Sequence, residues 1–175
     1  YSAEEDVGYA GALRTNATIV AQDPIFGEIA YGGLLTRDAK SVFVLRGGVP
    51  VFVDIRADTL NIDETLIEAA ITPRTKAIVP VHYAGVSCEM DTIADIARRH
   101  KLMVIEDAAQ AIGGSVGDRM CGSFGHVGAT SFYPAKPLGC YGDGGAMFTN
   151  DDALAAKLRS FAFHGKGETQ YDNIH

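Results

Sequence analysis

The chain has 175 residues, of which 47% are hydrophobic, and carries a formal net charge of -7 at pH 7. This length suffices for one substantial core, and apolar residues spread without a long apolar run argue against disorder and a membrane span. An acidic chain is a poor candidate for binding nucleic acid, because domains that bind phosphate backbones are usually basic.

Residues 1–47 give no element order that we can assign, so we treat them as an unassigned N-terminal segment. From residue 48 to 175, strand and helix patterns alternate. In chain order they predict a strand at 51–54, a helix at 63–71, a strand at 76–81, a helix at 90–99, a strand ending at Asp107, a strand at 145–149 and a helix at 151–161. The inner faces of the first two helices are expected to carry Leu66, Ile67 and Ala70, and Ile93, Ile96 and Ala97. This order predicts an α/β fold with parallel strands and right-handed crossovers.

The strand that ends at Asp107 carries a first candidate site residue. In open α/β sheets, ligands collect beyond the carboxyl ends of the strands, where Asp107 stands. A carboxylate there can hold a pyridine nitrogen protonated, as pyridoxal phosphate enzymes require together with a Schiff-base lysine. Asp107 could equally cap a helix that begins at Ala108, and both roles are compatible.

A lysine stands in an unusual context further along the chain. The segment SFYPAKPLGCYGDGGA, residues 131 to 146, places Lys136 among small, aromatic and glycine residues. A lysine there can lose part of its hydration, which favours the neutral amine that attacks carbonyl groups to form a Schiff base. The alternative is an ordinary solvated surface lysine, and this segment alone does not decide between the two.

Other residues with reactive side chains carry less information. Cys88, Cys121 and Cys140 have irregular spacing and no C-x-x-C pair, which favours a reducing, cytoplasmic location. Cys140 lies near Lys136, but a small apolar filler is the simpler interpretation. His82 and Cys88 are too few for a zinc site, so we predict no metal. The glycines at 142–145 precede a strand instead of opening a helix, which argues against a dinucleotide fingerprint.

Several motifs in order resemble one family. They are PVFVDI at 50–55, NIDETLIEAAITPRTKAIVPVHYAG at 61–85, VIEDAAQAIGG at 104–114 and GSFGHVGATSFYPAKPLGCYGDGGAMFTND at 122–151. These segments resemble the sugar aminotransferases of the DegT/DnrJ/EryC1/StrS family over roughly Gly48 to His164. The resemblance implies the three-layer, mostly parallel sheet of the large domain of fold-type-I pyridoxal-phosphate-dependent transferases. It also implies a domain incomplete at both ends, because the family's upstream Gly-Thr phosphate loop is not found and its small C-terminal domain would follow residue 175.

The resemblance assigns five residues to one pyridoxal 5'-phosphate site. Lys136 is similar to the family's Schiff-base lysine, which also moves the proton, and Asp107 to the partner of the pyridine nitrogen. Gln110 corresponds to the contact of the ring hydroxyl, Ser131 to the serine that donates to the phosphate, and Ala109 to the residue packed against the ring.

The implied function is an aminotransferase of amino-sugar and polysaccharide biosynthesis. It would move an amino group from an amino acid, with glutamate as the expected donor, to a nucleotide-linked keto-sugar. A UDP-linked 3-keto-hexuronic acid is one candidate substrate, and His164 and Tyr171 are candidate substrate contacts. The family also implies a homodimer with shared active sites. Two alternatives stay open: a sugar dehydratase of the same family, which has a histidine where Lys136 stands, and a non-catalytic binding or regulatory protein that retains the fold.

Overall fold

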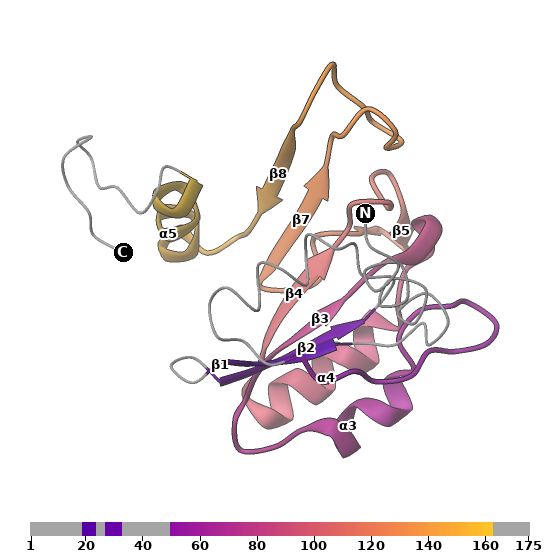
Figure 1. The fold of residues 1–175 in the computed structure, drawn as a ribbon, viewed down its shortest axis with the longest axis vertical. Coiled ribbons are helices and arrows are strands. Elements are labelled where there is room, and N and C mark those ends of the chain that lie inside the picture. The colour runs from indigo at the N-terminus through magenta and orange to yellow at the C-terminus, as the bar shows by residue number, and fades with distance from the viewer. Residues whose placement is uncertain (1–18, 24–26, 33–49, 163–175) are drawn as a thin grey trace, which may run out of the picture.

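The computed structural model describes residues 19–23, 27–32 and 50–162. Its main feature is a six-stranded sheet in the order β1-β2-β3-β4-β7-β8 (Figure 1). The strands are β1 (Ile19–Asp23), β2 (Gly27–Gly32), β3 (Thr75–Pro80), β4 (Met103–Asp107), β7 (Val127–Ser131) and β8 (Gly145–Phe148). β2, β3, β4 and β7 are parallel, whereas β1 and β8 pair antiparallel at the two edges. A separate hairpin is formed by two strands of two residues each, β5 (Ser115–Val116) and β6 (Arg119–Met120).

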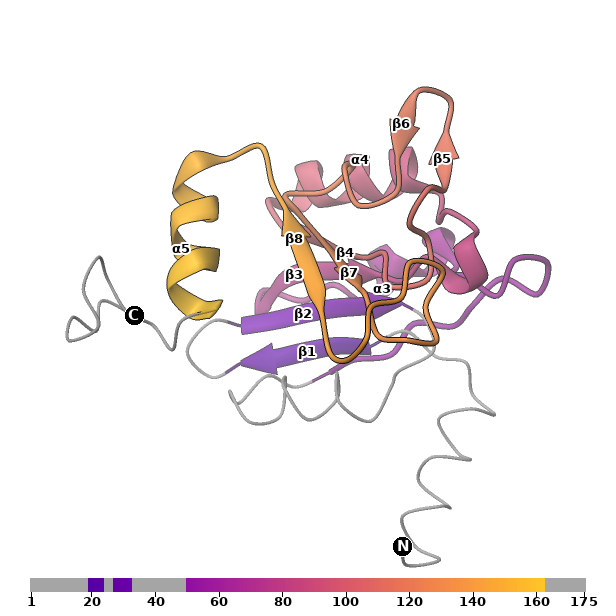
Figure 2. The same cartoon turned by 90° about the horizontal axis from the view of Figure 1, so that it is seen from above.

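The unit β3-α4-β4 confirms the predicted β-α-β order. Helix α4 (Met90–His100) buries Ile93, Ile96 and Ala97 against the sheet and lies over β3 and β4 in Figure 2. Ile78 of β3 pairs in register with Val104 of β4, and both belong to this core. The helix has one apolar face, and burying that face stabilises it against the strands.

The predicted helix at 63–71 forms in two short pieces. The Asp63 carboxylate accepts hydrogen bonds from the Thr65 N–H at 3.0 Å and the Thr65 hydroxyl at 2.6 Å, which starts the 3₁₀ turn η1 (Glu64–Leu66). Helix α3 (Ile67–Ala70) follows, with Ile67 buried. The inner position expected for Leu66 is wrong, since its side chain is 43% exposed. A 3₁₀ turn rotates successive side chains by more than an α-helix does, and this shifts Leu66 outward.

The predicted strand at 51–54 is also wrong, because only isolated bridges form there, at Val51 and Ile55. The backbone of this segment bonds locally instead. The Asp63 N–H donates to the Asp54 carbonyl at 2.9 Å, and the Arg56 N–H donates to the Asn61 carbonyl at 2.9 Å. These bonds close a loop around 56–61 and use groups that a strand of the main sheet would need.

The C-terminal elements agree with the sequence to within one residue. β8 is followed by helix α5 (Asp152–Ala162), whose start is capped by the Asp151 carboxylate, which accepts from the Leu154 N–H at 2.9 Å. At the other end of the sheet, β1 and β2 lie in the segment that the sequence left unassigned, and β2 pairs with β3. None of the helices in the described ranges is long and apolar enough to cross a membrane.

Candidate functional site

Three residues on adjacent strands are aligned across the sheet, and this alignment places the candidate site residues. Asp107 on β4 is opposite Val81 just after β3, and opposite Ala129 on β7. Side chains alternate between faces along a strand, so Asp107 points to the face opposite the one on which Val104 packs with α4. Ser131, two residues beyond Ala129, points to the same face as Asp107. Asp107 and Ser131 therefore share one face at the carboxyl edge of the sheet.

The segment after Asp107 is a turn, so the predicted helix starting at Ala108 is wrong. The Ala108 N–H donates to the Ala129 carbonyl at 2.8 Å and extends the ladder between β4 and β7. The Ala108 carbonyl accepts from the Thr130 hydroxyl at 3.2 Å, which further binds this residue to β7. The Asp107 carboxylate still binds the backbone of this turn, because its Oδ1 accepts from the Ala109 N–H at 3.0 Å. Asp107 and Ala109 are thus in direct contact.

The side-chain amide of Gln110 has a defined orientation. Its Oε1 accepts from the Ala84 N–H at 2.8 Å, and a backbone N–H can only donate. The NH₂ end of Gln110 is therefore the part of this amide that can donate to a ligand. Ala84 lies in the left-handed region with φ 51°, and buried Asn61 holds the turn by accepting from the Tyr83 N–H at 2.9 Å and donating to the Val86 carbonyl at 3.0 Å.

Lys136 lies in the loop that joins β7 to β8. The loop opens as a continuation of the ladder, with the Phe132 N–H donating to the Gly144 carbonyl at 2.7 Å. A turn follows, in which the Lys136 N–H donates to the Tyr133 carbonyl at 2.8 Å. Lys136 is half-buried, and its loop leaves the same edge of the sheet at which Asp107 ends β4 (Figure 1). Cys140 in this loop is exposed, and its thiol donates to the Gly142 carbonyl at 3.1 Å.

The five residues singled out from the sequence are thus all at or beyond the carboxyl ends of two adjacent parallel strands. Asp107 and Ala109 touch, Gln110 follows in the same turn, and Ser131 shares the face of Asp107. Lys136 reaches this edge through the loop after β7. The candidate substrate contacts His164 and Tyr171 lie outside the described residues.

A buried polar network below this edge was missed in the sequence, where His82 was weighed only as a metal ligand. His82 and Glu106 are both fully buried, with 2.9 Å between Nε2 and Oε2. The Glu106 carboxylate also accepts from the N–H of Gly122, at 2.7 Å, and of Gly125. The sequence did contain a sign of this network. Glu106 is two residues beyond core residue Val104 on an apolar strand and therefore shares its buried face, and a charge at a core position requires buried partners.

The protonation of this network follows from its donors. The Cys88 N–H donates to His82 Nδ1 at 3.1 Å, so the ring proton is on Nε2 and is donated to Glu106. Burial alone raises the pKa of Glu106, but the hydrogen bonds from His82, Gly125 and Gly122 outweigh it and hold that pKa below its ordinary value. Burial raises the pKa of the Cys88 thiol. The described residues include no group of three or more side chains able to hold a metal.

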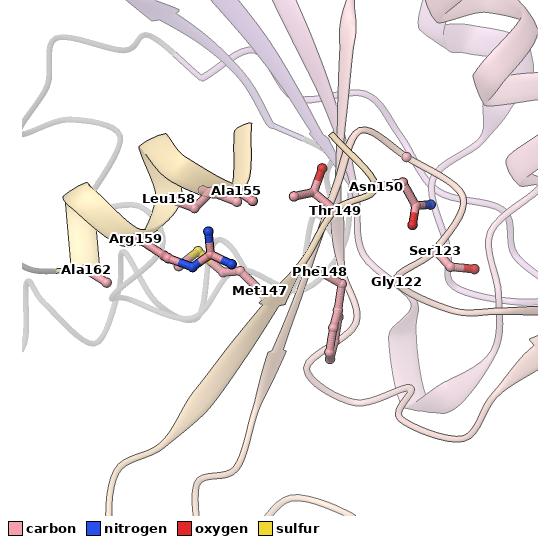
Figure 3. Close-up of a pocket in the computed structure, with 11 residues that line it drawn as sticks. Gly122, Ser123, Met147, Phe148, Thr149, Asn150, Ala155, Leu158, Arg159 and Ala162 are labelled. Atoms are coloured by element: carbon pink, nitrogen blue, oxygen red, sulfur yellow. The ribbon is translucent and has the colours of Figure 1, made fainter. Parts of the chain in front are cut away.

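The cavity in Figure 3 is separate from the five residues. It has a volume of about 500 Å³ and lies between β8 and α5, with Gly122, Phe148 and Arg159 in its walls. None of the five candidate residues lines this cavity, so we do not assign it to the candidate site.

A mostly parallel α/β sheet with these residues at its carboxyl edge is the large-domain architecture of fold-type-I aminotransferases. A model of the DegT/DnrJ/EryC1/StrS aminotransferase family matches residues 39–175, and the chain belongs to this family. Members of the family are pyridoxal-phosphate-dependent aminotransferases. Both the family and the fold class predicted from the sequence are confirmed.

Three known proteins illustrate the similarity. The chain is 53% identical over 148 residues to the UDP-2-acetamido-2-deoxy-3-oxo-D-glucuronate aminotransferase of Pseudomonas aeruginosa, covering 84% of this chain and 41% of that protein. It is 51% identical over 128 residues to a pleiotropic regulatory protein of Geobacillus stearothermophilus, covering 73% and 34%. The crystal structure of a family aminotransferase from Brucella abortus superimposes with a TM-score of 0.76 at 43% identity, covering 98% of this chain and 52% of that one. The chain thus spans less than half the length of both sequence relatives.

Proposed function

We propose that the protein is a pyridoxal-phosphate-dependent aminotransferase that moves an amino group from glutamate to a nucleotide-linked keto-sugar. The observation that carries this proposal is the shared face of Asp107 and Ser131, with Lys136 in the loop that follows. The substrate class is supported by the Pseudomonas relative, whose name specifies a UDP-linked 3-oxo-glucuronate. We therefore propose a UDP-linked 3-keto-hexuronic acid as the amino acceptor.

The side chains at this edge fit the cofactor chemically. When bound, pyridoxal phosphate supplies an aldehyde that exchanges amines and a ring that withdraws electrons. Asp107 would hold a proton on the pyridine nitrogen, and the Ser131 hydroxyl would donate to the phosphate. The NH₂ end of Gln110, left available by the bond from Ala84, would donate to the ring hydroxyl. Ala109 would pack against the ring, where a small side chain leaves room for it.

Lys136 has two tasks in this proposal. Its amine would attach the cofactor through a Schiff base in the resting enzyme. Once displaced by the amino substrate, the same amine would take the proton from the reacting substrate carbon as a general base and return one as a general acid. Its half-buried position in the loop that leaves the carboxyl edge of the sheet suits both tasks.

We further propose a homodimer with shared active sites. The loop that carries Lys136 exposes three large apolar or aromatic side chains: Tyr133 at 53%, Leu138 at 55% and Tyr141 at full exposure. Such a cluster beside a site favours burial against a partner chain. The cytoplasmic location remains a proposal, supported by the free thiols of Cys88, Cys121 and Cys140.

The domain arrangement is part of the same proposal. Residues 48–175 would belong to the cofactor-binding large domain, and the pairing of β2 with β3 extends that domain into the segment before residue 48. The family's smaller C-terminal domain would lie in the part of the protein that corresponds to the remaining length of the relatives.

The non-catalytic alternative has one specific point in its favour, the regulatory name of the Geobacillus relative. A protein that only binds would not need both a lysine amine and a pyridine-binding carboxylate, so Lys136 and Asp107 favour catalysis. The dehydratase alternative is disfavoured because Lys136 stands where a dehydratase has histidine.

The test is amino transfer by the full-length protein. Loaded with pyridoxal phosphate, it is incubated with glutamate and UDP-linked 3-keto sugars, with and without the uronic carboxylate. We expect a 3-amino sugar nucleotide and an equal amount of 2-oxoglutarate. Cofactor binding without transfer to any keto-sugar would favour the regulatory alternative, and loss of a sugar hydroxyl without amination would favour the dehydratase.

A further inference from the structure

We infer that Glu106 and His82 form a buried positioning pair, which fixes the end of β4, and with it Asp107, relative to the end of β3 and the turn that precedes β7. The role assigned to Asp107 rests on the proposed function. The pair itself stands on geometry alone.

The pair joins three segments that are far apart in sequence. His82 directly follows β3, Glu106 is the residue before Asp107 on β4, and Gly122 and Gly125 belong to the turn before β7. One carboxylate therefore accepts an N–H from each neighbouring segment. The backbone supports the same contact, because the His82 N–H donates to the Asp107 carbonyl at 3.0 Å.

The buried charge of Glu106 makes the pair sensitive to the loss of any hydrogen-bond donor. Glu106 carries a negative charge in a fully buried position, and His82 is neutral because its Nδ1 accepts from the Cys88 N–H. The charge is compensated by N–H donors instead of a cation. Removing one donor leaves a buried carboxylate partly unsatisfied, which costs far more than a surface bond would.

The link from this pair to Asp107 is the alternation of the strand. The Glu106 side chain points to the α4 face and that of Asp107 to the opposite face, so the paired side chains of His82 and Glu106 do not reach the face of the candidate site. It determines where β4 ends instead. A displacement of about 1 Å in a catalytic group costs on the order of a hundredfold in rate, so a small shift of β4 is enough to affect Asp107.

Replacing Glu106 with Gln tests the pair with almost no change of size. Both carboxylate oxygens accept N–H groups, so the NH₂ of a glutamine must face a donor, whichever way the amide turns. In full-length protein loaded with pyridoxal phosphate, we expect kcat for amino transfer to fall on the order of a hundredfold, with the KM for glutamate little changed. The matched control is Glu64→Gln, which removes another buried carboxylate, paired with Arg56, and should keep kcat. Equal kcat in the two variants would overturn the inference.

Two variants at His82 separate positioning from general loss of structure. His82→Gln retains an N–H that can reach Glu106, whereas His82→Leu retains none. We expect His82→Leu to unfold at a lower temperature than His82→Gln, and His82→Gln to recover most of the kcat that His82→Leu loses when both are assayed well below their unfolding temperatures. Equal activity in the two variants would contradict the role of the bond to Glu106.

Nitrogen NMR of the unmodified full-length protein, labelled at its histidines, provides a test that needs neither activity nor a variant that folds. We expect the ring proton of His82 to be on Nε2, because Nδ1 accepts from the Cys88 N–H. A proton on Nδ1, or a charged ring, would overturn the pair whatever the enzyme does. If the protein binds no pyridoxal phosphate but His82 shows this tautomer, the proposed function fails while the pair stands.

Discussion

Asp107 on β4 and Ala129 on β7 are directly opposite each other, and the Ala108 N–H continues this pairing by donating to the Ala129 carbonyl at 2.8 Å. This register brings Ser131 to the face that Asp107 occupies. A shift by one residue would turn Ser131 to the α4 side, so the geometry of the candidate site depends on how β4 and β7 are paired.

Asp107→Asn should separate the electrostatic role of Asp107 from its structural one. An asparagine Oδ1 can still accept from the Ala109 N–H, so the turn after β4 should be retained, with an unchanged thermal unfolding temperature. The lysine can still form its Schiff base, but the pyridine nitrogen loses its anionic partner. We expect the visible Schiff-base band to persist while kcat for amino transfer falls at least about a hundredfold. A kcat within a few fold of the unmodified protein would remove Asp107 from the mechanism.

Lys101→Gly should stabilise the protein. Lys101 ends α4 in the left-handed conformation, with φ 56° and ψ 42°, and is exposed. A non-glycine residue there carries a steric cost of roughly 1 kcal/mol that glycine avoids, so we expect a gain of several tenths to about 1 kcal/mol in the free energy of unfolding. Chemical denaturation measures it.

Lys157→Gly, inside the exposed part of α5, is the matched control for Lys101→Gly. It should cost about 1 kcal/mol, since glycine has a low helix propensity. Destabilisation by both substitutions would show that the left-handed conformation of Lys101 does not govern the end of α4.

Glu106 should contribute to the loss of stability in acid. Because its folded-state pKa is lowered below the ordinary value of 4.5, its contribution is fully present above that value and is lost as the pH falls through the folded-state pKa. The Glu106→Gln protein should be less stable at neutral pH and should lose less on acidification below about 4.5. Unfolding midpoints measured from pH 7 down to pH 3 test this, and parallel curves for the two proteins would contradict it.

Much of the fold was predictable from the sequence because periodicity and burial act locally. The 3.6-residue pattern of Ile93, Ile96 and Ala97 identified α4, and the apolar run before Glu106 identified β4. The strand expected at 51–54 was wrong because Asp54 and Arg56 form backbone hydrogen bonds with residues 61–63 instead of with a sheet strand. The apolar pattern of residues 51–54 does not encode these bonds. The helix expected at Ala108 was wrong for the same reason, since its N–H bonds to β7 instead.

The site was predictable only in part. The resemblance identified Asp107, Ala109, Gln110, Ser131 and Lys136, and their grouping around a cofactor stays a prediction. The strand register, the orientation of the Gln110 amide by Ala84 and the pairing of His82 with Glu106 depend on contacts between segments more than twenty residues apart. Such contacts leave no periodic signal in one sequence.

The role of Lys136 can be tested by the visible absorption spectrum of the full-length protein mixed with pyridoxal phosphate, compared with that of the Lys136→Ala variant. We expect the unmodified protein to show the yellow band of a lysine Schiff base, which shifts when glutamate is added. Lys136→Ala should lack that band and still retain the cofactor without a covalent bond through Ser131 and Asp107, whereas Lys157→Ala, on exposed α5, should behave as the unmodified protein. An unchanged yellow band in Lys136→Ala, or substantial amino transfer by that variant without an added amine, would contradict the assignment of Lys136.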